Sequence, residues 1–395
     1  MKTIHWLGAG LSTVPGIRRL ATRDLPLVIW NRTVSRAREA LSGIDTEAGV
    51  RALDIEALTA AVKPGDIVVS MLPGDWHVKM ATLALSRDAH FVSSSYVSPE
   101  MQALDRQAKD KGLCLVNEVG LDPGIDHLMA HALVHDYKNA SAYSPHNQVF
   151  FRSYCGGFPS IPNDFRYKFS WSPLGVLKAL KSPSRSIRGG KTVDVQRPWH
   201  AITEYQAHLP GRHKETFQAY PNRDALPFIA AYHFDSAWEV QEFVRGTLRL
   251  VGWSEAWKDI FAEIGTLAGP SGDERLQAMS DQLWKTQAYG PDEPDRVVLC
   301  VELETRNNGT PVWHQSYTID ALGNAKGTAM ARLVSLTVSL AVEAVASDMI
   351  EPGVSAAPAD YKIVQQWFAA LMELGEQIER IDHLPHPHRI VGVVP

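Results

Sequence analysis

The stretch that decides the fold stands at the start of the chain, where residues 2–33 read KTIHWLGAGLSTVPGIRRLATRDLPLVIWNRT. An apolar, β-branched run over residues 2–7 ends directly at Gly8-Ala9-Gly10. A helix-compatible segment follows over residues 14–23, and a second apolar run begins at Leu27. Strand, helix and strand in this order form a βαβ unit, whose two strands lie parallel in one sheet. The opening residues therefore predict a parallel α/β sheet.

The same alternation continues to about residue 120. Four more runs predict strands at residues 50–54, 66–72, 90–94 and 113–118, and the helix-compatible segments lie at residues 34–41, 55–62, 76–86 and 99–111. Each strand is followed by a helix long enough to cross over the sheet. We therefore expect a doubly wound parallel sheet with helices on both faces.

The character of the sequence changes after about residue 120. Longer alternating runs predict an antiparallel sheet with one exposed face, at residues 147–154, 297–305 and 312–319, and residues 236–288 look mostly helical. Residues 360–380 are also helix-compatible, and we expect them to pack on the first domain. The apolar run over residues 330–350 carries Arg332, Glu343 and Asp348, which predicts a buried or amphipathic helix rather than a membrane span.

Length and charge bound the class of protein. The 395 residues predict two or three domains. The 39 Lys and Arg against 44 Asp and Glu give a net charge of −5, so charge offers no reason to expect nucleic acid or a membrane as a partner. Three cysteines, Cys114, Cys155 and Cys300, suit a reducing compartment, and the N-terminus lacks the long apolar core of a signal peptide. We therefore expect a cytoplasmic protein.

The turn at Gly8-Ala9-Gly10 indicates a dinucleotide site. Gly8 permits the tight turn after the strand, and Gly10 lets backbone N–H groups approach a pyrophosphate at the helix N-terminus, with Leu11 and Ser12 continuing the loop. Thr13 stands where the common fingerprint has its third glycine, so the match is partial. Taken alone, the motif is also compatible with a simple strand-to-helix turn.

The end of the second predicted strand favours NADP(H) over NAD(H). Asn31-Arg32-Thr33 contains no Asp or Glu, the residue that binds the ribose 2′-hydroxyl in an NAD site. Arg32 can form a fork on a 2′-phosphate, Thr33 can donate its hydroxyl, and Arg36 lies one helical turn later. The alternative is a helix N-cap at Thr33 with a solvated basic face. The predicted cofactor-binding residues are Gly8, Gly10, Leu11, Ser12, Asn31, Arg32, Thr33, Arg36, Met71 and Leu72.

Residues 117–127 read NEVGLDPGIDH, and this stretch resembles the signature of the saccharopine reductase family, the glutamate-forming saccharopine dehydrogenases. Five further stretches are similar to landmarks of that family and keep their order. They are SSYVSP (94–99), SYCGG (153–157), YKFSWS (167–172), RGTLR (245–249) and GVSAAP (353–358). The resemblance covers roughly residues 4–358.

The resemblance implies a Rossmann-like, NADP-binding domain over residues 1–120 and an inserted α+β substrate domain over residues 121–350, with a helical subregion at about residues 210–290. It also implies that residues 351–395 return to the first domain. The implied activity is NADP-dependent oxidation of the CH–NH group of the small molecule saccharopine to L-glutamate and 2-aminoadipate 6-semialdehyde, or the reverse, in lysine metabolism. A homodimer is expected from analogy with the fold alone.

This reaction requires proton transfers near an amine and an attacking water, and groups that hold three carboxylates. Asp122 is the first candidate at the reacting nitrogen, because it follows a predicted parallel strand at the sheet edge where ligands bind. An Asx turn or a helix N-cap is the alternative. Tyr96 and Cys155 are the other catalytic candidates by resemblance. Cys155 is not expected to be a nucleophile, and its other interpretation is a small buried apolar side chain.

The predicted substrate contacts are Tyr96, Asp122, Gly156, Lys168, Ser170, Arg245 and Thr247. Arg245 is expected to hold a carboxylate as a fork together with Thr247, and Gly156 to let the backbone approach a ligand. The alternatives are a surface helix end for Arg245 and a solvated strand position for Lys168.

No metal is predicted. His127, His131 and His135 recur every four residues and share one helix face, as paired zinc ligands do, but Leu128 stands where the zincin pattern needs Glu. Hydride transfer to NADP needs no metal. A polar helix face or histidines that line the substrate site are the simpler interpretation.

Two alternatives to the saccharopine reaction stay open. Residues 163–166 read NDFR where the family usually has Asn-Pro-Leu-Gly, so Asp164 and Arg166 could change which amino acid is accepted. This leaves room for a sister secondary-amine dehydrogenase, for example of the carboxynorspermidine type. The second alternative is a catalytically silent NADP-binding protein.

Overall fold

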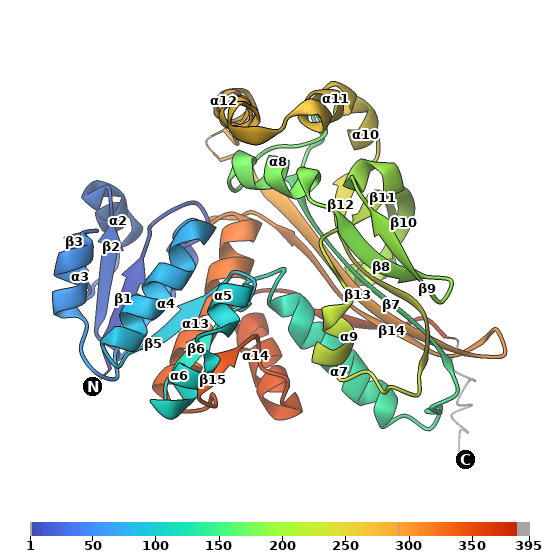
Figure 1. Cartoon of the computed structure of the whole chain (residues 1–395), viewed down its shortest axis with the longest axis horizontal. Coiled ribbons are helices and arrows are strands. Elements are labelled where there is room, and N and C mark those ends of the chain that lie inside the picture. The colour runs from blue at the N-terminus through green and yellow to red at the C-terminus, as the bar shows by residue number, and fades with distance from the viewer. Residues whose placement is uncertain (1, 291, 385–395) are drawn as a thin grey trace, which may run out of the picture.

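In the computed structural model, which describes residues 2–290 and 292–384, the chain forms two β-sheets that lie beside each other (Figure 1). One hydrophobic cluster runs through both sheets, from Ile4 and Trp6 in the first to Leu299 and Val301 in the second. Helix α13 (Ala329–Ala346) contacts strands of both sheets. The two sheets are therefore joined by a common core.

The first sheet is parallel throughout, in the order β15-β6-β5-β4-β1-β2-β3. Its strands are β1 (Ile4–Leu7), β2 (Leu27–Asn31), β3 (Gly49–Ala52), β4 (Ile67–Ser70), β5 (His90–Ser93), β6 (Cys114–Val116) and β15 (Gly353–Ser355). Ile4 and Trp6 pack into the cluster on one face, and Leu7 packs into a second cluster on the opposite face. The doubly wound parallel sheet predicted from the sequence is confirmed.

Helices cover both faces of this sheet. They are α1 (Val14–Ala21), α2 (Val34–Ala40), α3 (Ile55–Ala61), α4 (His77–Ser86), α5 (Pro99–Gln102) and α6 (Asp105–Asp110), with a 3-10 turn, η1, at Gly74–Trp76. Helix α1 packs closely against α13, because Gly16 has no side chain: an added Cβ would lie 2.3 Å from the carbonyl oxygen of Ser335. The Gly16 N–H also donates to the Ser335 hydroxyl at 2.8 Å.

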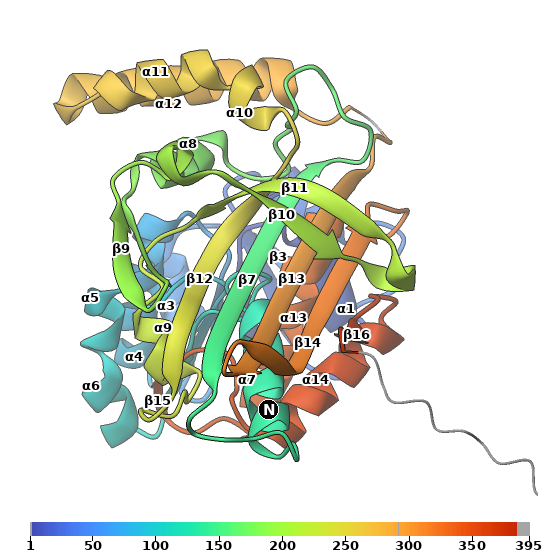
Figure 2. The same cartoon turned by 90° about the vertical axis from the view of Figure 1, so that its right-hand side faces the viewer.

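The second sheet is mixed and has nine strands, with the main path β10-β11-β12-β7-β13-β14-β16. Its strands are β7 (Gln148–Pro159), β8 (Ser184–Arg188), β9 (Lys191–Val195), β10 (Thr203–His208), β11 (Lys214–Pro221), β12 (Glu239–Leu250), β13 (Asp295–Asn307), β14 (Thr310–Leu322) and β16 (Glu379–Asp382). Strands β7 and β12 pair in parallel, and the other pairs are antiparallel. Figure 2 looks onto this sheet.

Helices α7 (Ile125–Lys138) and α14 (Tyr361–Glu373) lie behind the second sheet in Figure 2. At the other end of the sheet, α8 (Pro173–Lys181), α10 (Trp253–Ala256), α11 (Lys258–Thr266) and α12 (Gly269–Gln287) form a helical cap around their own hydrophobic cluster (Figure 1). The remaining short helices are α9 (Pro227–Ala231), η2 (Pro198–Ala201) and η3 (Pro210–Arg212).

The predicted helical region of the second domain is partly wrong. The helices expected within residues 236–288 are present from Trp253 onward, but β12 occupies Glu239–Leu250 at the start of that range. The subregion expected to begin near residue 210 contains β11 and, before Trp253, only the short helices η3 and α9. Strand β12 is buried on both faces, with Phe243 in one cluster and Val244 in another. A strand buried on both faces lacks the clean polar alternation that identifies an exposed sheet.

The C-terminal segment divides between the two sheets. Strand β15 pairs with β6 and extends the parallel sheet, but β16 pairs with β14 of the second sheet. The prediction that residues 351–395 return to the first domain is therefore wrong for Glu379–Asp382. Residues 385–395 of that prediction lie outside the described residues.

Helix α13 is long and apolar enough to cross a membrane by length and composition, and 78% of its apolar window is buried inside the protein. Its buried side chains pack against α1 and the strands of both sheets. The run at residues 330–350 is thus a buried core helix, one of the two forms predicted for it.

Candidate active site at the junction of the two sheets

The loop after β1 has the geometry of a nucleotide-binding turn. Gly8 has a φ of +100°, and an added Cβ there would lie 3.0 Å from the carbonyl oxygen of Met71 at the end of β4. An added Cβ at Gly10 would meet no heavy atom within 4 Å, so this side of the loop is open. Thr13 donates its hydroxyl to the Gly10 carbonyl at 2.8 Å and braces the turn. The close packing that the third glycine of the fingerprint provides falls instead to Gly16.

Of the four predicted cofactor residues at and after the end of β2, one is hydrogen-bonded within the protein and three are exposed. The Asn31 side chain accepts from Ala9 N–H at 3.0 Å and donates to the Thr33 carbonyl at 2.8 Å, so it ties the two loops together. Arg32, Thr33 and Arg36 are exposed, and in the described part of the chain neither guanidinium has a partner. Thr33 occupies the N-cap of α2, but its hydroxyl makes no capping bond. These free donors fit a phosphate.

The other predicted cofactor residues lie beside the same turn. Leu11 is 53% exposed and Ser12 is half-buried. Met71 and Leu72 follow β4, and the Leu72 side chain comes within 3.5 Å of the position of an added Cβ at Gly8. All of them border the carboxyl edge of the parallel sheet, where dinucleotides bind.

Four polar side chains meet between the two sheets. Tyr96, after β5, donates its hydroxyl to Asp122 Oδ1 at 3.1 Å, and Arg245 on β12 donates from Nη2 to the same oxygen at 3.0 Å. The same Nη2 lies 2.5 Å from Oδ2 of Asp126 on α7 and 3.3 Å from the Tyr96 hydroxyl. The structure thus brings together Tyr96, Asp122 and Arg245, all named from the sequence, and adds Asp126.

The two carboxyls of this cluster differ in their acidity. Burial raises the pKa of Asp122 to about 6, with a further rise from the Asp126 charge and an opposing effect of Arg245. Burial also acts to raise the pKa of Asp126, but the charges of His127 and Arg245 and the Gly124 N–H outweigh it and lower that pKa. Asp126 is therefore the permanent counter-ion of Arg245, and Asp122 is the group that exchanges a proton near neutral pH.

Two residues that the sequence did not indicate complete this cluster. Phe228 on α9 lies flat against Arg245, with the guanidinium carbon 3.9 Å from the ring centre. Arg223, exposed and with a φ of +58°, has its guanidinium carbon 4.9 Å from the centre of the Tyr96 ring. Burial raises the pKa of Tyr96 well above its usual value, so the phenol remains a neutral donor.

Cys155 on β7 is buried and lies opposite Thr247 of β12 in the sheet register. Burial, followed by the charges of Asp122 and Asp126, raises the pKa of this thiol well above its usual value. A thiol held in its protonated form is not a nucleophile. Cys155 therefore borders the acidic cluster without the reactivity of a catalytic cysteine.

Strand β12 presents a row of polar side chains to one side. Arg245, Thr247 and Arg249 are spaced by two residues, so they leave the same face of the sheet. Arg249 also acts on the pKa of Cys155, which places its charge near the same region. The alternation was present in the sequence motif RGTLR, but Arg249 was not singled out there.

Arg249 is a buried cation without a carboxylate partner. Its guanidinium carbon lies 4.8 Å from the ring centre of Tyr167, 5.3 Å from that of Trp253 and 5.6 Å from that of Tyr220. Nη1 donates to the Leu248 carbonyl at 3.0 Å, whereas Nε has no hydrogen-bond partner. Over residues 2–290 and 292–384, no carboxylate pairs with it. A buried guanidinium in this state favours an external carboxylate.

Three of the predicted substrate contacts have partners within the chain. An added Cβ at Gly156 would lie 2.5 Å from the Leu248 carbonyl oxygen, so this glycine allows β7 to approach β12 rather than a ligand. Lys168 Nζ lies 2.5 Å from Glu293 Oε2. Arg245 lies 3.0 Å from Asp122 and 2.5 Å from Asp126. Ser170 is buried near Gly157, 3.9 Å from an added Cβ there.

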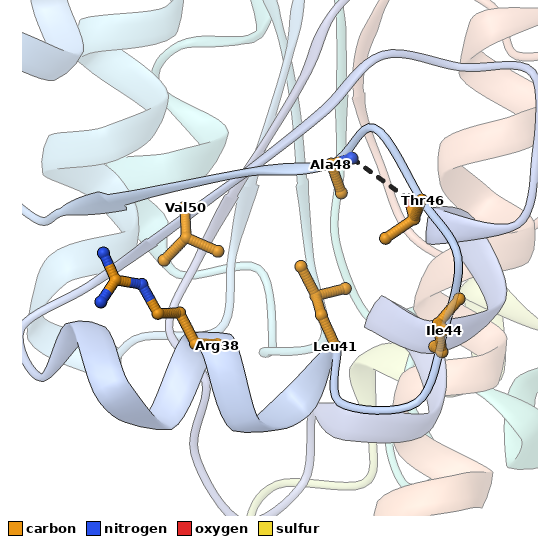
Figure 3. A pocket seen from close by; sticks show the side chains of 6 residues that line it. All are labelled: Arg38, Leu41, Ile44, Thr46, Ala48 and Val50. Atoms are coloured by element: carbon orange, nitrogen blue, oxygen red, sulfur yellow. Dashed lines mark hydrogen bonds between the residues drawn. The ribbon is translucent and has the colours of Figure 1, made fainter.

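A surface cavity of about 450 Å³ lies elsewhere in the first domain, lined by Arg38, Leu41, Ile44, Thr46, Ala48 and Val50 (Figure 3). Its residues come from the end of α2, the loop that follows and the start of β3, at the edge opposite the carboxyl ends of the parallel strands. It does not coincide with the predicted cofactor site.

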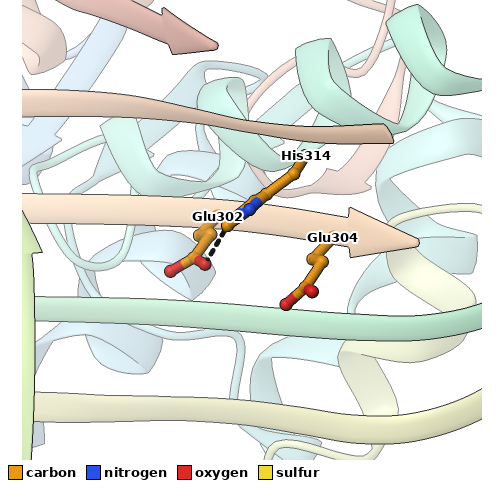
Figure 4. Close-up of side chains that lie close together, drawn as sticks. All are labelled: Glu302, Glu304 and His314. Atoms are coloured by element: carbon orange, nitrogen blue, oxygen red, sulfur yellow. Dashed lines mark hydrogen bonds and ion pairs between the residues drawn. The ribbon is translucent and has the colours of Figure 1, made fainter. Parts of the chain in front are cut away.

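One grouping of potential metal ligands in the described residues is Glu302, Glu304 and His314 on β13 and β14 (Figure 4). Its carboxylates already have cationic partners, because Arg152 lies 2.9 Å from Glu302 and 3.4 Å from Glu304, and Arg306 lies 2.6 Å from Glu304. Guanidinium groups occupy the acceptor oxygens that a metal ion would need. We read this grouping as an ion-pair network that links strands.

Histidines of α7 also contact other side chains of the same chain. His127 Nε2 lies 2.7 Å from Glu118 Oε2, and the His135 ring stacks on Tyr361 at 3.7 Å between centroids. Burial lowers the pKa of His131 to about 3. The shared helix face therefore does not gather the three rings around one point.

A parallel sheet with an open glycine turn, and an ionisable carboxyl where this sheet meets a second sheet, define the class of two-domain dinucleotide-binding proteins with a second ligand site at the domain junction. Within this class, residues 4–116 match the family model described as the saccharopine dehydrogenase NADP binding domain, and residues 120–375 match the saccharopine dehydrogenase C-terminal domain. The chain belongs to the saccharopine dehydrogenase family, and its first domain is the NADP-binding domain of that family.

Relatives and a solved structure agree with this assignment. The chain is 36% identical over 291 residues to saccharopine dehydrogenase [NADP(+), L-glutamate-forming] of Pyricularia oryzae, covering 72% of this chain and 61% of the relative. It is 33% identical over 263 residues to the protein of the same name from Schizosaccharomyces pombe, covering 65% and 56%. The chain thus spans less than two thirds of these relatives.

The fold itself matches the apo structure of saccharopine dehydrogenase (L-Glu forming) from Saccharomyces cerevisiae. The TM-score is 0.80 at 24% identity, and the match covers 97% of this chain and 100% of that chain. This likeness confirms the predicted combination of a Rossmann-like domain with a second α+β domain. The sheet of the second domain was predicted to be antiparallel, and this is wrong for the parallel pair β7–β12, which makes the sheet mixed.

Proposed function

We propose that the protein is an NADP-dependent oxidoreductase that converts saccharopine to L-glutamate and 2-aminoadipate 6-semialdehyde, or catalyses the reverse reaction, in lysine metabolism. The observation that carries the proposal is the geometry at the junction. An ionisable carboxyl, Asp122, lies beside a β12 face that also bears Arg249, a cation with no carboxylate partner in the part of the chain that the structure describes. A secondary amine with several carboxylates matches both features.

The cofactor residues belong to the first sheet. NADP, when bound, supplies the hydride acceptor. Gly8 and Gly10 would hold its pyrophosphate, and the free donors of Arg32 and Thr33 suit a 2′-phosphate.

The remaining residues handle protons and carboxylates. Asp122, ionised above a pKa of about 6, accepts a proton from the substrate amine or from the attacking water. Tyr96 donates a hydrogen bond to Asp122 and orients it. Arg249 holds a carboxylate roughly 13 Å along β12 from Arg245, at about 3.3 Å per residue. Arg223 is a second exposed cation beside Tyr96 for another carboxylate.

The direct test is NADPH formation by the purified protein with saccharopine at mildly alkaline pH, run in parallel with NADP and NAD. We expect turnover with NADP to exceed turnover with NAD, and glutamate and semialdehyde to appear in equal amounts. No turnover despite measurable NADPH binding would overturn the assignment of saccharopine as the substrate and favour a sister secondary-amine dehydrogenase. If NADPH does not bind, the assignment of NADP(H) as the cofactor is overturned as well.

One observation keeps the sister enzyme as the second candidate. Arg166 takes a φ of +56° at the position where the family usually has glycine, and its Nε lies 3.6 Å from an added Cβ at Gly252, beside Trp253 of the helical cap. A bulky cation held in this uncommon conformation changes the surroundings of the aromatic rings that pack around Arg249. Activity with carboxynorspermidine but not with saccharopine would support this candidate.

We further propose that the enzyme is a cytoplasmic homodimer. The three cysteines are free and buried, which suits a reducing compartment. Light scattering after size exclusion would measure the mass in solution, and a monomeric mass at micromolar concentration would overturn the dimer. Imaging of a tagged full-length protein in its host would test the location.

A further inference from the structure

Glu118 and His127 form a buried pair behind the Asp122 cluster. His127 Nε2 lies 2.7 Å from Glu118 Oε2, and His127 Nδ1 lies 2.7 Å from the Tyr232 hydroxyl. The two residues are 5% and 2% exposed. Polar side chains buried together in this way need a specific arrangement to offset their desolvation.

Glu118 holds both backbone neighbours of Tyr96. Its N–H donates to the Ser95 carbonyl at 3.0 Å, and its Oε1 accepts from the Val97 N–H at 2.8 Å. It does so with a φ of +55°, a conformation uncommon for a glutamate. The strained backbone therefore coincides with the contacts that fix the loop carrying Tyr96.

His127 reaches Arg245 by two routes. Its Nδ1 lies 3.8 Å from Oδ2 of Asp126, the oxygen that binds Arg245. Its ring also stacks on Phe228 at 5.4 Å between centroids, and Phe228 in turn lies against the Arg245 guanidinium. Neither Glu118 nor His127 is hydrogen-bonded to Asp122 in the described part of the chain.

We infer that the Glu118–His127 pair is a positioning unit for Asp122. Glu118 fixes Tyr96 from one side, His127 fixes Asp126 and Arg245 from the other, and Tyr96 and Arg245 together hold the Asp122 carboxyl in place. The role of Asp122 toward substrate rests on the proposed function, whereas its placement by this pair is a property of the protein alone.

The electrostatic effect of His127 on the neighbouring carboxyls gives this unit a measurable signature. The titratable and charged groups that surround the imidazole come from every neighbouring element; they are Tyr96, Glu118, Asp122, Asp126, His131, Tyr232 and Arg245. A positive His127 lowers the pKa of Asp126 and of Asp122. Replacing it by glutamine keeps a donor and an acceptor but removes the charge, so the Asp122 titration moves to higher pH.

The experiment compares His127→Gln and Glu118→Gln with a matched control, His131→Gln, one turn further along α7 and also against the Tyr232 ring. Carbon-13 NMR of labelled aspartate follows the Asp122 carboxyl with pH, and Asp122→Asn assigns the signal. For His127→Gln we expect a higher titration midpoint. For both test variants we expect kcat with saccharopine to fall by about 100-fold, as for a misplacement of about 1 Å. NADPH affinity and the behaviour of His131→Gln stay at wild-type values.

The outcomes separate the inference from the proposed function. Wild-type titration and wild-type kcat in His127→Gln would overturn the inference while leaving the function intact. A wild-type protein without saccharopine turnover, but with an Asp122 titration that moves in His127→Gln and not in His131→Gln, would keep the inference and reject the function. If His127→Gln loses its near-ultraviolet circular dichroism, it has lost its tertiary packing and cannot test the inference. The kcat of Glu118→Gln is then the test, and a wild-type kcat in that variant overturns the inference.

Discussion

Arg245 and Arg249 stand four residues apart on β12 and leave the same face of the strand, yet their electrostatic surroundings are opposite. Arg245 has Asp122 at 3.0 Å and Asp126 at 2.5 Å. Arg249 has three aromatic rings around it and no carboxylate among the residues that the structure describes. Each side chain belongs to a residue that is 5% exposed, so burial does not distinguish them.

This contrast teaches how to assign a buried cation. A guanidinium with internal counter-ions takes part in the protein's own charge balance, and removing it leaves unpaired buried carboxylates. A guanidinium without counter-ions is the one whose charge a ligand can complete. On this ground, the proposed role of Arg245 is to support Asp122, and the proposed role of Arg249 is to bind substrate.

The largest effect is expected from Arg245→Met, which removes the cation but keeps an apolar side chain. Buried Asp126 and half-buried Asp122 would then lose the guanidinium that pairs with both of them, and the free energy of unfolding should fall by about 3–5 kcal/mol at pH 8. Urea denaturation measures this change. The double variant Arg245→Met with Asp126→Asn should recover part of the lost stability. If Arg245→Met is as stable as the wild type, Arg245 does not differ from Arg249 in its contribution to the protein's own charge balance.

Asp122→Asn tests whether the carboxyl that pairs with Arg245 accepts the proton in the reaction. Because Asp122 accepts a proton only when ionised, kcat/KM for saccharopine in the wild type should decline as the pH falls below about 6. In the variant, kcat should drop by about 100-fold or more and this acid limb should vanish. NADPH binding serves as the control. An acid limb that persists unchanged in Asp122→Asn would assign the titration to another group.

Arg249→Met should act on substrate rather than on stability. Loss of a charged hydrogen bond, worth about 1.5–3 kcal/mol, should raise the KM for saccharopine by about 10- to 100-fold. The free energy of unfolding should change by no more than about 1 kcal/mol, because lost cation–π contacts are offset by removal of a buried unpaired charge. An unchanged KM, or a stability loss equal to that of Arg245→Met, would contradict the assignment.

The smallest effect is expected at a third guanidinium, Arg32, which is exposed and unpaired in the described residues. Arg32→Ala should weaken NADP(H) binding by about tenfold and leave NAD(H) binding unchanged, because only NADP carries the 2′-phosphate. Arg38→Ala, in the same domain but at the opposite sheet edge, is the control. Equal losses for the two cofactors would remove Arg32 from phosphate recognition.

Much of the fold could be predicted from short-range patterns. Strands β1–β6 lie within the predicted runs or within one residue of them, because each is a brief apolar segment bounded by turn residues. Strand β12 was missed since both of its faces are buried. Strand β16 was missed because its pairing with β14 joins residues far apart along the chain, which no local pattern encodes.

The sequence by itself determined the parallel sheet, the glycine turn and the residue types of the site, including Asp122, Tyr96 and Arg245, because turns, periodicity and motifs depend on neighbours along the chain. Only the tertiary structure decided which charges meet: that Asp126 pairs with Arg245, that Arg249 has no counter-ion within residues 2–290 and 292–384, and that Glu118 and His127 stand behind Asp122. The physical reason is that a side chain's acidity and its availability to a ligand are set by burial and by partners that folding brings from distant positions.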